Sequence, residues 1–213
     1  MALSKVDFNN INVTPAASKA LKFNSAADGF ETGDLGGSMV LLSTATASSS
    51  ANISFTSGID STYKEYQFHF TDIHPQTDNK TFFVLFRDGG SSFDATVTST
   101  GFDAYHNEDD DATGLAYNTG VDLAQGTGGQ VLFEDQGNDN DQCGCGILHL
   151  FNPSSTTFVK HFIARTRNTH HGNYTADEYI AGYCNVTAAI NGVQFKFASG
   201  NIDAGTIKMY GIL

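Results

Sequence analysis

Hydrophobic and polar residues alternate along most of the chain after residue 38, with the two-residue period of half-buried β-strands. Runs of this kind recur to the last residue, separated by glycine-containing turns, and they predict about ten short strands. The runs are Met39–Leu42, Ile53–Phe55, Tyr66–Phe70, Phe82–Phe86, Ala95–Ser99, Val131–Glu134, Ile147–Phe151, Phe158–Ala164, Tyr179–Val186, Val193–Phe197 and Gly205–Leu213. The predicted fold is all-β: an antiparallel two-sheet sandwich of jelly-roll type.

The final run stops with the chain and is the most regular. Ile207 and Met209 fall on one face, and Lys208, Tyr210 and Ile212 fall on the other. A chain that ends in such a strand is expected to use it to complete a sheet, since termini are otherwise loosely held. Ile207 and Met209 are therefore predicted to close the core.

The N-terminal segment is different in character. Thr14–Phe23 has the composition of a turn of helix, whereas Asp28–Gly37 is rich in glycine and aspartate and resembles a loop. Two parts are predicted: an arm or attachment segment over residues 1–35 and a β-sandwich over residues 36–213.

The composition is consistent with a β-rich domain, and the net charge excludes some classes of binding partner. The 213 residues include 17 Phe, 8 Tyr and 22 Gly but only three Pro and no Trp, a mixture typical of short strands joined by turns. The net charge of −12 opposes binding to nucleic acid or to an anionic membrane. The beginning of the chain lacks the apolar core of a secretion signal, and no window is long and apolar enough for a membrane span. Synthesis in a cytoplasm is expected, with no membrane insertion.

Two acidic stretches are candidate cation sites. Asp109, Asp110 and Asp111 form the densest charge run, and Asp139 and Asp141 belong to a second. Oxygen-rich loops can hold Ca²⁺, but neither stretch has the glycine and terminal glutamate of an EF-hand loop. Solvated loops are the favoured interpretation; no metal and no cofactor are predicted.

The three cysteines leave alternatives open. Cys143 and Cys145 have a C-x-C spacing, which could supply two thiolates to a metal, with Cys184 and a histidine completing the set. A disulfide from Cys184 to one member of the pair is a second possibility. Small buried thiols without a partner are the simplest alternative.

One histidine-rich segment is the candidate binding surface. His170 and His171 follow Arg167 and precede Tyr174, and we expect Thr166 to Thr175 to form an outward loop. Paired histidines with arginine and tyrosine could contact a glycan or a partner surface. A plain exposed loop is the alternative.

The sequence carries none of the familiar catalytic patterns. It has no Gly-x-Ser-x-Gly, no His-Glu-x-x-His and no phosphate-binding loop with Lys-Ser/Thr. A glycosidase needs only two carboxylates at a suitable distance, which 23 acidic residues can provide, so a depolymerase remains a third-ranked alternative. A non-enzymatic protein is predicted.

Several segments taken together resemble a family of small β-rich virion proteins of tailed phages of marine bacteria, including cyanophages. The similarity spans residues 36–212 and is carried by Thr56–Pro75, Ala124–Gly128, Gly137–Gln142, Leu150–Phe162 and Ser199–Ile212. It implies a structural protein of the virion, a tail fibre or other appendage ahead of a capsid decoration protein. It brings no catalytic residues.

By analogy with phage appendages, a homo-oligomer is expected, a trimer ahead of other states. Residues 1–35 would contact other virion proteins, and the outward loops would face a host cell-surface glycan. A carbohydrate-binding, lectin-like sandwich is the rival class, although the absence of Trp counts against a sugar platform.

Overall fold

The structure is a computed structural model that describes residues 13–14, 19–34 and 38–213. The chain divides into two compact units, Met1–Ser38 and Met39–Leu213, where the sequence places the boundary after residue 35. The described residues contain strands and turns but no helix, and every pairing between strands is antiparallel, so the all-β prediction is confirmed.

The first unit contains a single hairpin. Strands β1 (Lys19–Phe23) and β2 (Phe30–Asp34) pair so that Phe23 lies opposite Phe30, with ring centroids 5.0 Å apart. Both rings are exposed, Phe23 at 67% and Phe30 at 46%. The predicted turn of helix over Thr14–Phe23 is wrong for Lys19–Phe23, which are extended, and its residues 15–18 lie outside the described part of the chain.

The second unit is one thirteen-stranded sheet. Its strands are β3 (Met39–Thr46), β4 (Ile53–Phe55), β5 (Glu65–Pro75), β6 (Lys80–Arg87), β7 (Val97–Asn107), β8 (Thr113–Tyr117), β9 (Leu123–Gly126), β10 (Gln130–Gln136), β11 (Gly144–Phe151), β12 (Lys160–His170), β13 (Tyr174–Cys184), β14 (Gly192–Phe197) and β15 (Ile202–Ile212).

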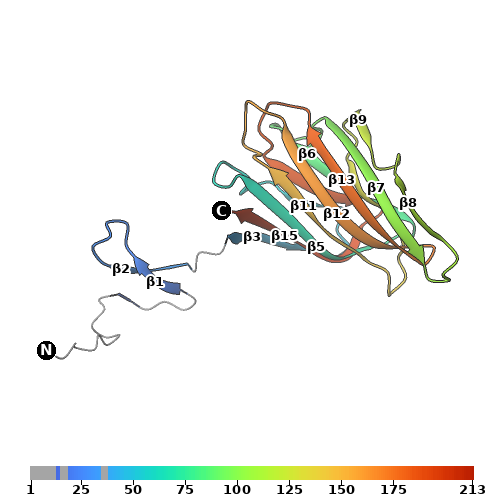
Figure 1. Cartoon of the computed structure of the whole chain (residues 1–213), viewed down its shortest axis with the longest axis horizontal. Coiled ribbons are helices and arrows are strands. Elements are labelled where there is room, and N and C mark those ends of the chain that lie inside the picture. The colour runs from blue at the N-terminus through green and yellow to red at the C-terminus, as the bar shows by residue number, and fades with distance from the viewer. Residues whose placement is uncertain (1–12, 15–18, 35–37) are drawn as a thin grey trace. The chain divides into compact units, whose positions relative to one another are not determined.

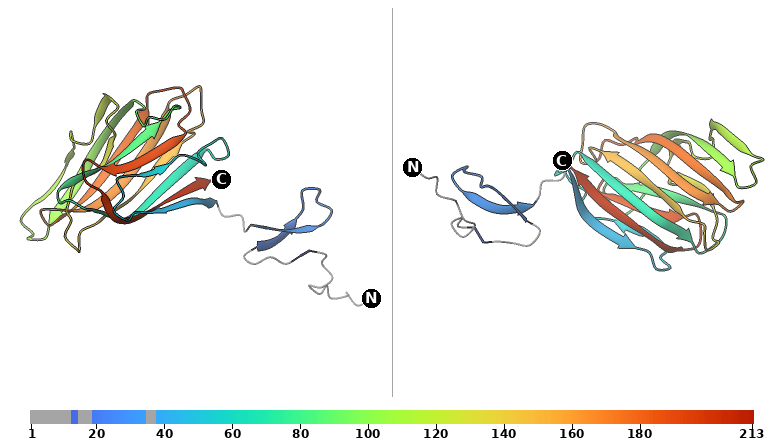
Figure 2. Two further views of the ribbon diagram at one scale, coloured as in Figure 1. Left: turned by 180° about the vertical axis from the view of Figure 1, so that it is seen from behind. Right: turned by 60° about the horizontal axis from the view of Figure 1, so that its bottom comes forward.

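The sheet folds over into two layers. A long layer runs β3-β15-β5-β11-β12-β13-β7, and β8 and β9 both pair with the far edge of β7. A short layer runs β10-β6-β14-β4. Among the strand pairings of the described residues, the one between Gln136 of β10 and His170 of β12 joins the two layers. In Figure 1 β11, β12, β13 and β7 lie side by side in front with β6 behind them, and Figure 2 gives two further views.

Phenylalanine fills the space between the layers. Phe68 and Phe70 of β5 meet Phe195 of β14 and Phe82 of β6, with ring centroids 5.6 and 6.1 Å apart, and Phe133 of β10 stacks on Phe82 at 5.0 Å. All five side chains are at most 2% exposed. Because alternate residues of each strand point inward, the two-residue period of the sequence directly produces this core.

The terminal strand β15 lies inside the long layer, between β3 and β5. Ile207 and Met209 are 0% and 1% exposed. Gly205, with φ of +127°, stands in an irregular stretch of the β15–β5 pairing where an added Cβ would lie 2.8 Å from the carbonyl oxygen of Asp72, so only glycine fits there.

Shortening Ile207 by one methyl group tests how tightly this strand packs. Ile207→Val is expected to lower the free energy of unfolding by about 1 kcal/mol, because the lost methylene leaves a small void in a close-packed core. Ile212→Val, at a half-buried position on the opposite face of β15, is the control and should be near neutral. Urea unfolding measures both; equal effects would contradict the placement of Ile207 in the core.

A buried lysine holds two loops together at one end of the second unit. Lys160, the first residue of β12, is 0% exposed. Its Nζ shares three N–H donors among four carbonyl oxygens, those of Ser155 (3.3 Å) and Phe158 (3.2 Å) in the loop before β12 and of Val186 (2.7 Å) and Ala188 (2.5 Å) in the loop after β13. Burial lowers the pKa of Lys160, and Cys184 and Asp88 oppose that shift. Phe158, by contrast, is 70% exposed and precedes the strand that the sequence predicts it to begin.

Candidate functional site

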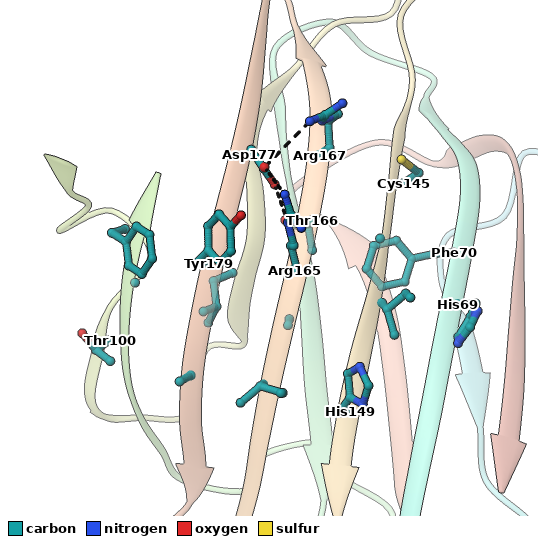
Figure 3. A pocket seen from close by; sticks show the side chains of 18 of the residues that line it. His69, Phe70, Thr100, Cys145, His149, Arg165, Thr166, Arg167, Asp177 and Tyr179 are labelled. Carbon is teal, nitrogen blue, oxygen red and sulfur yellow. Dashed lines mark hydrogen bonds and ion pairs between the residues drawn. The ribbon is translucent and has the colours of Figure 1, made fainter. Parts of the chain in front are cut away.

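The outer face of the long layer carries an elongated depression, named here the outer groove. Alternation on β12 turns Phe162, Ala164 and Thr166 into the core and Ile163, Arg165 and Arg167 toward solvent. The same alternation on β5, β11, β13 and β7 brings further outward side chains alongside them, as Figure 3 shows. The outer groove is therefore built on the faces of paired strands and not on loops.

Three hollows adjoin along this face. The central one, of about 870 Å³, extends from β7 to β5. A second of about 350 Å³ shares Thr100, Ile163 and Ala181 with it, and a third of about 630 Å³ shares His69 and Thr71. Together they form a continuous track across the strands, from β7 through β13, β12, β11 and β5 to β15.

A ladder of three planar groups forms one wall of the central hollow. Phe102 of β7 lies opposite Tyr179 of β13, with ring centroids 4.8 Å apart and planes 2° from parallel. Arg165 of β12 lies opposite Tyr179 on the other side, its guanidinium 4.8 Å from the ring centroid. Stacking and cation–π contact hold the ladder in place.

Asp177 fixes the cationic end of the ladder. It accepts hydrogen bonds from Arg165 Nε at 3.2 Å and Nη2 at 2.7 Å, a bidentate arrangement, and Arg167 Nη2 lies 3.8 Å from the same carboxylate. The hydrogen bonds to Asp177 raise the pKa of Arg165 above its ordinary value. Figure 3 shows both arginines reaching toward Asp177 from β12.

Histidine side chains and their hydrogen-bond partners lie at the opposite part of the outer groove. His149 Nδ1 lies 2.7 Å from Glu65 Oε1, and Gln67 donates to that same oxygen while its carbonyl oxygen contacts His69. Burial, with the nearby charges of His149 and Lys208, lowers the pKa of His69. Burial tends to raise the pKa of Glu65, but hydrogen bonds from Gln67 and His149 lower it overall, so the carboxylate is ionised.

The arrangement is suited to binding. It combines exposed apolar surface, with Phe102 and Ile163 each 45% exposed, with charged and amide groups at the edges. Sugar-sized ligands are usually held by such a combination of apolar surface and a few oriented polar groups.

The predicted surface-binding residues do not lie together in one site. Arg167 lies in the outer groove, but His170 is 9% exposed and its ring stacks on Tyr174 at 3.8 Å. The prediction of a loop from Thr166 to Thr175 is wrong: β12 continues to His170 and β13 begins at Tyr174, so only residues 171–173 turn. His171 lies at this turn and is exposed. Burial lowers the pKa of His170 and raises that of Tyr174 to about 12, as expected for structural side chains.

The acidic stretches form turns. Asp109, Asp110 and Asp111 lie in the turn between β7 and β8, where the amide oxygen of Asn107 accepts hydrogen bonds from the backbone N–H groups of Asp111 and Ala112. Asp139 and Asp141 lie before β11 and are exposed. Within the described ranges, no three His, Cys, Asp or Glu side chains are grouped as a metal site requires.

The alternatives that joined Cys184 to the cysteine pair are wrong. All three cysteines are free. On the shared neighbour β12, Cys184 lies opposite Lys160 and Cys145 opposite Arg167, so about 23 Å of strand separates them. A disulfide needs Cα atoms within about 7 Å. Burial raises the pKa of Cys184 to about 12, which makes it an unreactive core thiol.

A second polar site, named the buried acidic cluster, consists of the buried Glu178 with the partly exposed Asp103 and Glu134 beside it. Glu178 is 3% exposed; its Oε1 accepts a 3.5 Å hydrogen bond from Asn118, and its Oε2 has no partner. Asn118 also donates to Glu134 at 3.0 Å. Burial, reinforced by Asp103 and Glu134, raises the pKa of Glu178 to about 8.

The segment after β8 covers this cluster. The side chain of Gln130 donates to the carbonyl oxygen of Val121, and Val121 is 0% exposed. The cluster is therefore closed by Asn118–Val121, and a substrate has no direct access to Glu178.

Sequence reasoning missed most of the outer groove. The alternation in Phe162–Arg167 does carry a signal, since Ile163, Arg165 and Arg167 share one face. The partners Phe102 and Tyr179 come from β7 and β13, and their position opposite Arg165 depends on strand register, which the sequence does not display.

Comparison with protein-family models, with curated proteins and with solved structures gives no match. In the described part of the chain there is no helix with the length and apolar character needed to cross a membrane.

Proposed function

We propose that the protein is a non-enzymatic structural subunit of a phage virion, a tail fibre or other appendage that can bind the host surface. One observation carries this proposal: the chain divides into a compact sandwich unit and a small N-terminal unit with an exposed aromatic pair. An isolated two-stranded hairpin is at best marginally stable in water, so β1–β2 gains most from a partner.

We propose the jelly roll as the finer description of the sandwich unit. Eight of its strands, taken in chain order as β3, β4, β5, β6, β10, β11, β14 and β15, pair as β3-β15-β5-β11 in one layer and β4-β14-β6-β10 in the other. If these eight strands are renumbered 1 to 8 in chain order, the two layers have the orders 1-8-3-6 and 2-7-4-5, which are those of a double Greek key. The remaining strands, β7 to β9 and β12 to β13, then count as two insertions that widen one layer.

A homo-oligomer, with a trimer favoured, is part of the same proposal. The outer edge strand β3 exposes Met39 at 43% and Leu41 at 52%, apolar surface that a neighbouring subunit would cover. Other virion proteins are proposed as partners of residues 1–35, and the location is the virion after synthesis in the host cytoplasm. Light scattering of the purified protein reports the mass of the assembly.

Enclosure of the buried acidic cluster supports the non-enzymatic class. A glycosidase needs carboxyl groups on either side of a substrate bond. Glu178 is buried under Asn118–Val121, and the outer groove contributes Asp177 already bound to Arg165. Turnover of host polysaccharide by the purified protein would contradict this class.

The location on the particle is tested with antibodies raised against residues 39–213. Labelling confined to tails of intact particles is the expected result. Uniform labelling of the shell would favour the capsid decoration alternative, and absence of the protein from purified particles would overturn the virion assignment. Under that last outcome the lectin-like class, which the outer groove also fits, becomes the leading function.

A further inference from the structure

The outer groove has the dimensions of a track for an extended chain. Phe102, Tyr179, Arg165, Ile147, His69 and Lys208 are opposite one another in successive pairings, so they form one row across six strands. Five intervals of about 4.8 Å give a row of about 24 Å. The central hollow and the hollow of about 630 Å³ follow the same course, and the hollow of about 350 Å³ lies beside the central one.

The side chains along the track can recognise sugar rings. Ile163 and Phe102 offer apolar surface to C–H groups, while Asp177 and His149 offer hydrogen-bonding atoms to hydroxyl groups. The backbone groups under the track are already paired within the sheet, so an extended peptide would find no strand edge to join. A ligand must therefore be bound by side chains alone.

The charge of the track contrasts with that of the chain. The protein carries −12 overall and has three arginines, two of which line the central hollow with a single ionised acid, Asp177. Arg165 makes a bidentate pair with Asp177, whereas the one ion-pair contact of Arg167 among the described residues is a longer one, at 3.8 Å. The planar guanidinium of Arg167 is thus available to a planar carboxylate.

We propose that the outer groove binds an extended polysaccharide that carries carboxylate groups, with Arg167 as the carboxylate contact and the Phe102–Tyr179–Arg165 ladder as its rigid wall. The inference deepens the proposed function, because it names the class of host-surface glycan, but it concerns the purified chain and does not require the virion location.

Calorimetric titration of the full chain with alginate oligosaccharide, a linear polyuronate, tests the proposal. Binding is expected, with a preference over a neutral β-glucan oligosaccharide of the same length, and weakening as salt is added. Arg167→Gln should reduce the affinity about tenfold or more, since a charge-assisted hydrogen bond is lost. Lys196→Gln, which removes a cation from β14 in the short layer, is the matched control and should leave affinity unchanged.

Phe102→Ala provides a second variant that opens the ladder without changing charge; it should weaken polyuronate and neutral glycan alike. Absence of polyuronate binding, equal affinity for the neutral glycan, preference for a sulfated glycan, or an unchanged affinity in Arg167→Gln would each overturn the proposal. Tail labelling combined with no polyuronate binding would leave the virion function standing and remove only this ligand.

Discussion

Replacing Lys160 by methionine is expected to lower the free energy of unfolding by about 3–5 kcal/mol. Methionine has a similar length but donates no hydrogen bond, so the carbonyl oxygens of Ser155, Phe158, Val186 and Ala188 lose their shared donor. These carbonyls belong to two loops, and the loss would release both loops from the end of the thirteen-stranded sheet. Urea unfolding followed by circular dichroism measures the change.

Lys196→Met is the matched control for this prediction. Lys196 also lies in a strand, but its side chain points away from the core and is partly exposed. Its replacement should alter the free energy of unfolding by less than about 0.5 kcal/mol. If the two variants unfold at the same urea concentration, Lys160 does not hold the loops.

Glu178→Gln is expected to stabilise the protein at pH 8 by about 3–5 kcal/mol and to have little effect at pH 5. The pKa of Glu178 rises from an ordinary 4.5 to about 8 in the folded state, so the folded protein holds a proton that the unfolded chain has lost. Stability from this group is fully present below pH 4.5 and is lost as the pH rises toward 8. Glutamine resembles the protonated acid and does not ionise, so the variant keeps the stability that the parent protein loses as the pH rises.

The measurement is the difference in unfolding free energy between Glu178→Gln and the parent at several pH values. It should grow between pH 5 and pH 8 and then level off. Glu108→Gln, at an exposed acid in the turn after β7, should give a difference near zero throughout. A difference for Glu178→Gln that stays constant with pH would show that the carboxyl group is not protonated in the folded protein.

Much of the fold could be predicted from the sequence, because alternation alone indicates which residues of a strand face the core and which face solvent. Tyr66, Phe68 and Phe70, for example, alternate with the polar residues Gln67 and His69, and all three are buried. The N-terminal hairpin could not be predicted from the sequence. Lys19–Phe23 contains good helix formers, and pairing with Phe30–Asp34 overrides that preference.

The sites depended on information that the sequence does not carry. Arg165 and Phe102 reach the same ladder only through the register of β12, β13 and β7. Lys160 and Glu178 have the residue types of surface positions, yet their strands turn them inward, where four carbonyl oxygens satisfy the lysine and a raised pKa accommodates the acid. Tertiary environment decided each case.

The short strands β8 and β9 protect the protein against self-association. Without them the eleven residues of β7 would present unpaired N–H and C=O groups along an open edge, a template on which another chain could add a strand. β8 and β9 cover that edge in two short pieces, and the acidic turn at Asp109–Asp111 adds like charges beside it. The acidic residues first considered as cation ligands thus place like charges beside this edge, which disfavours the addition of a strand from another chain.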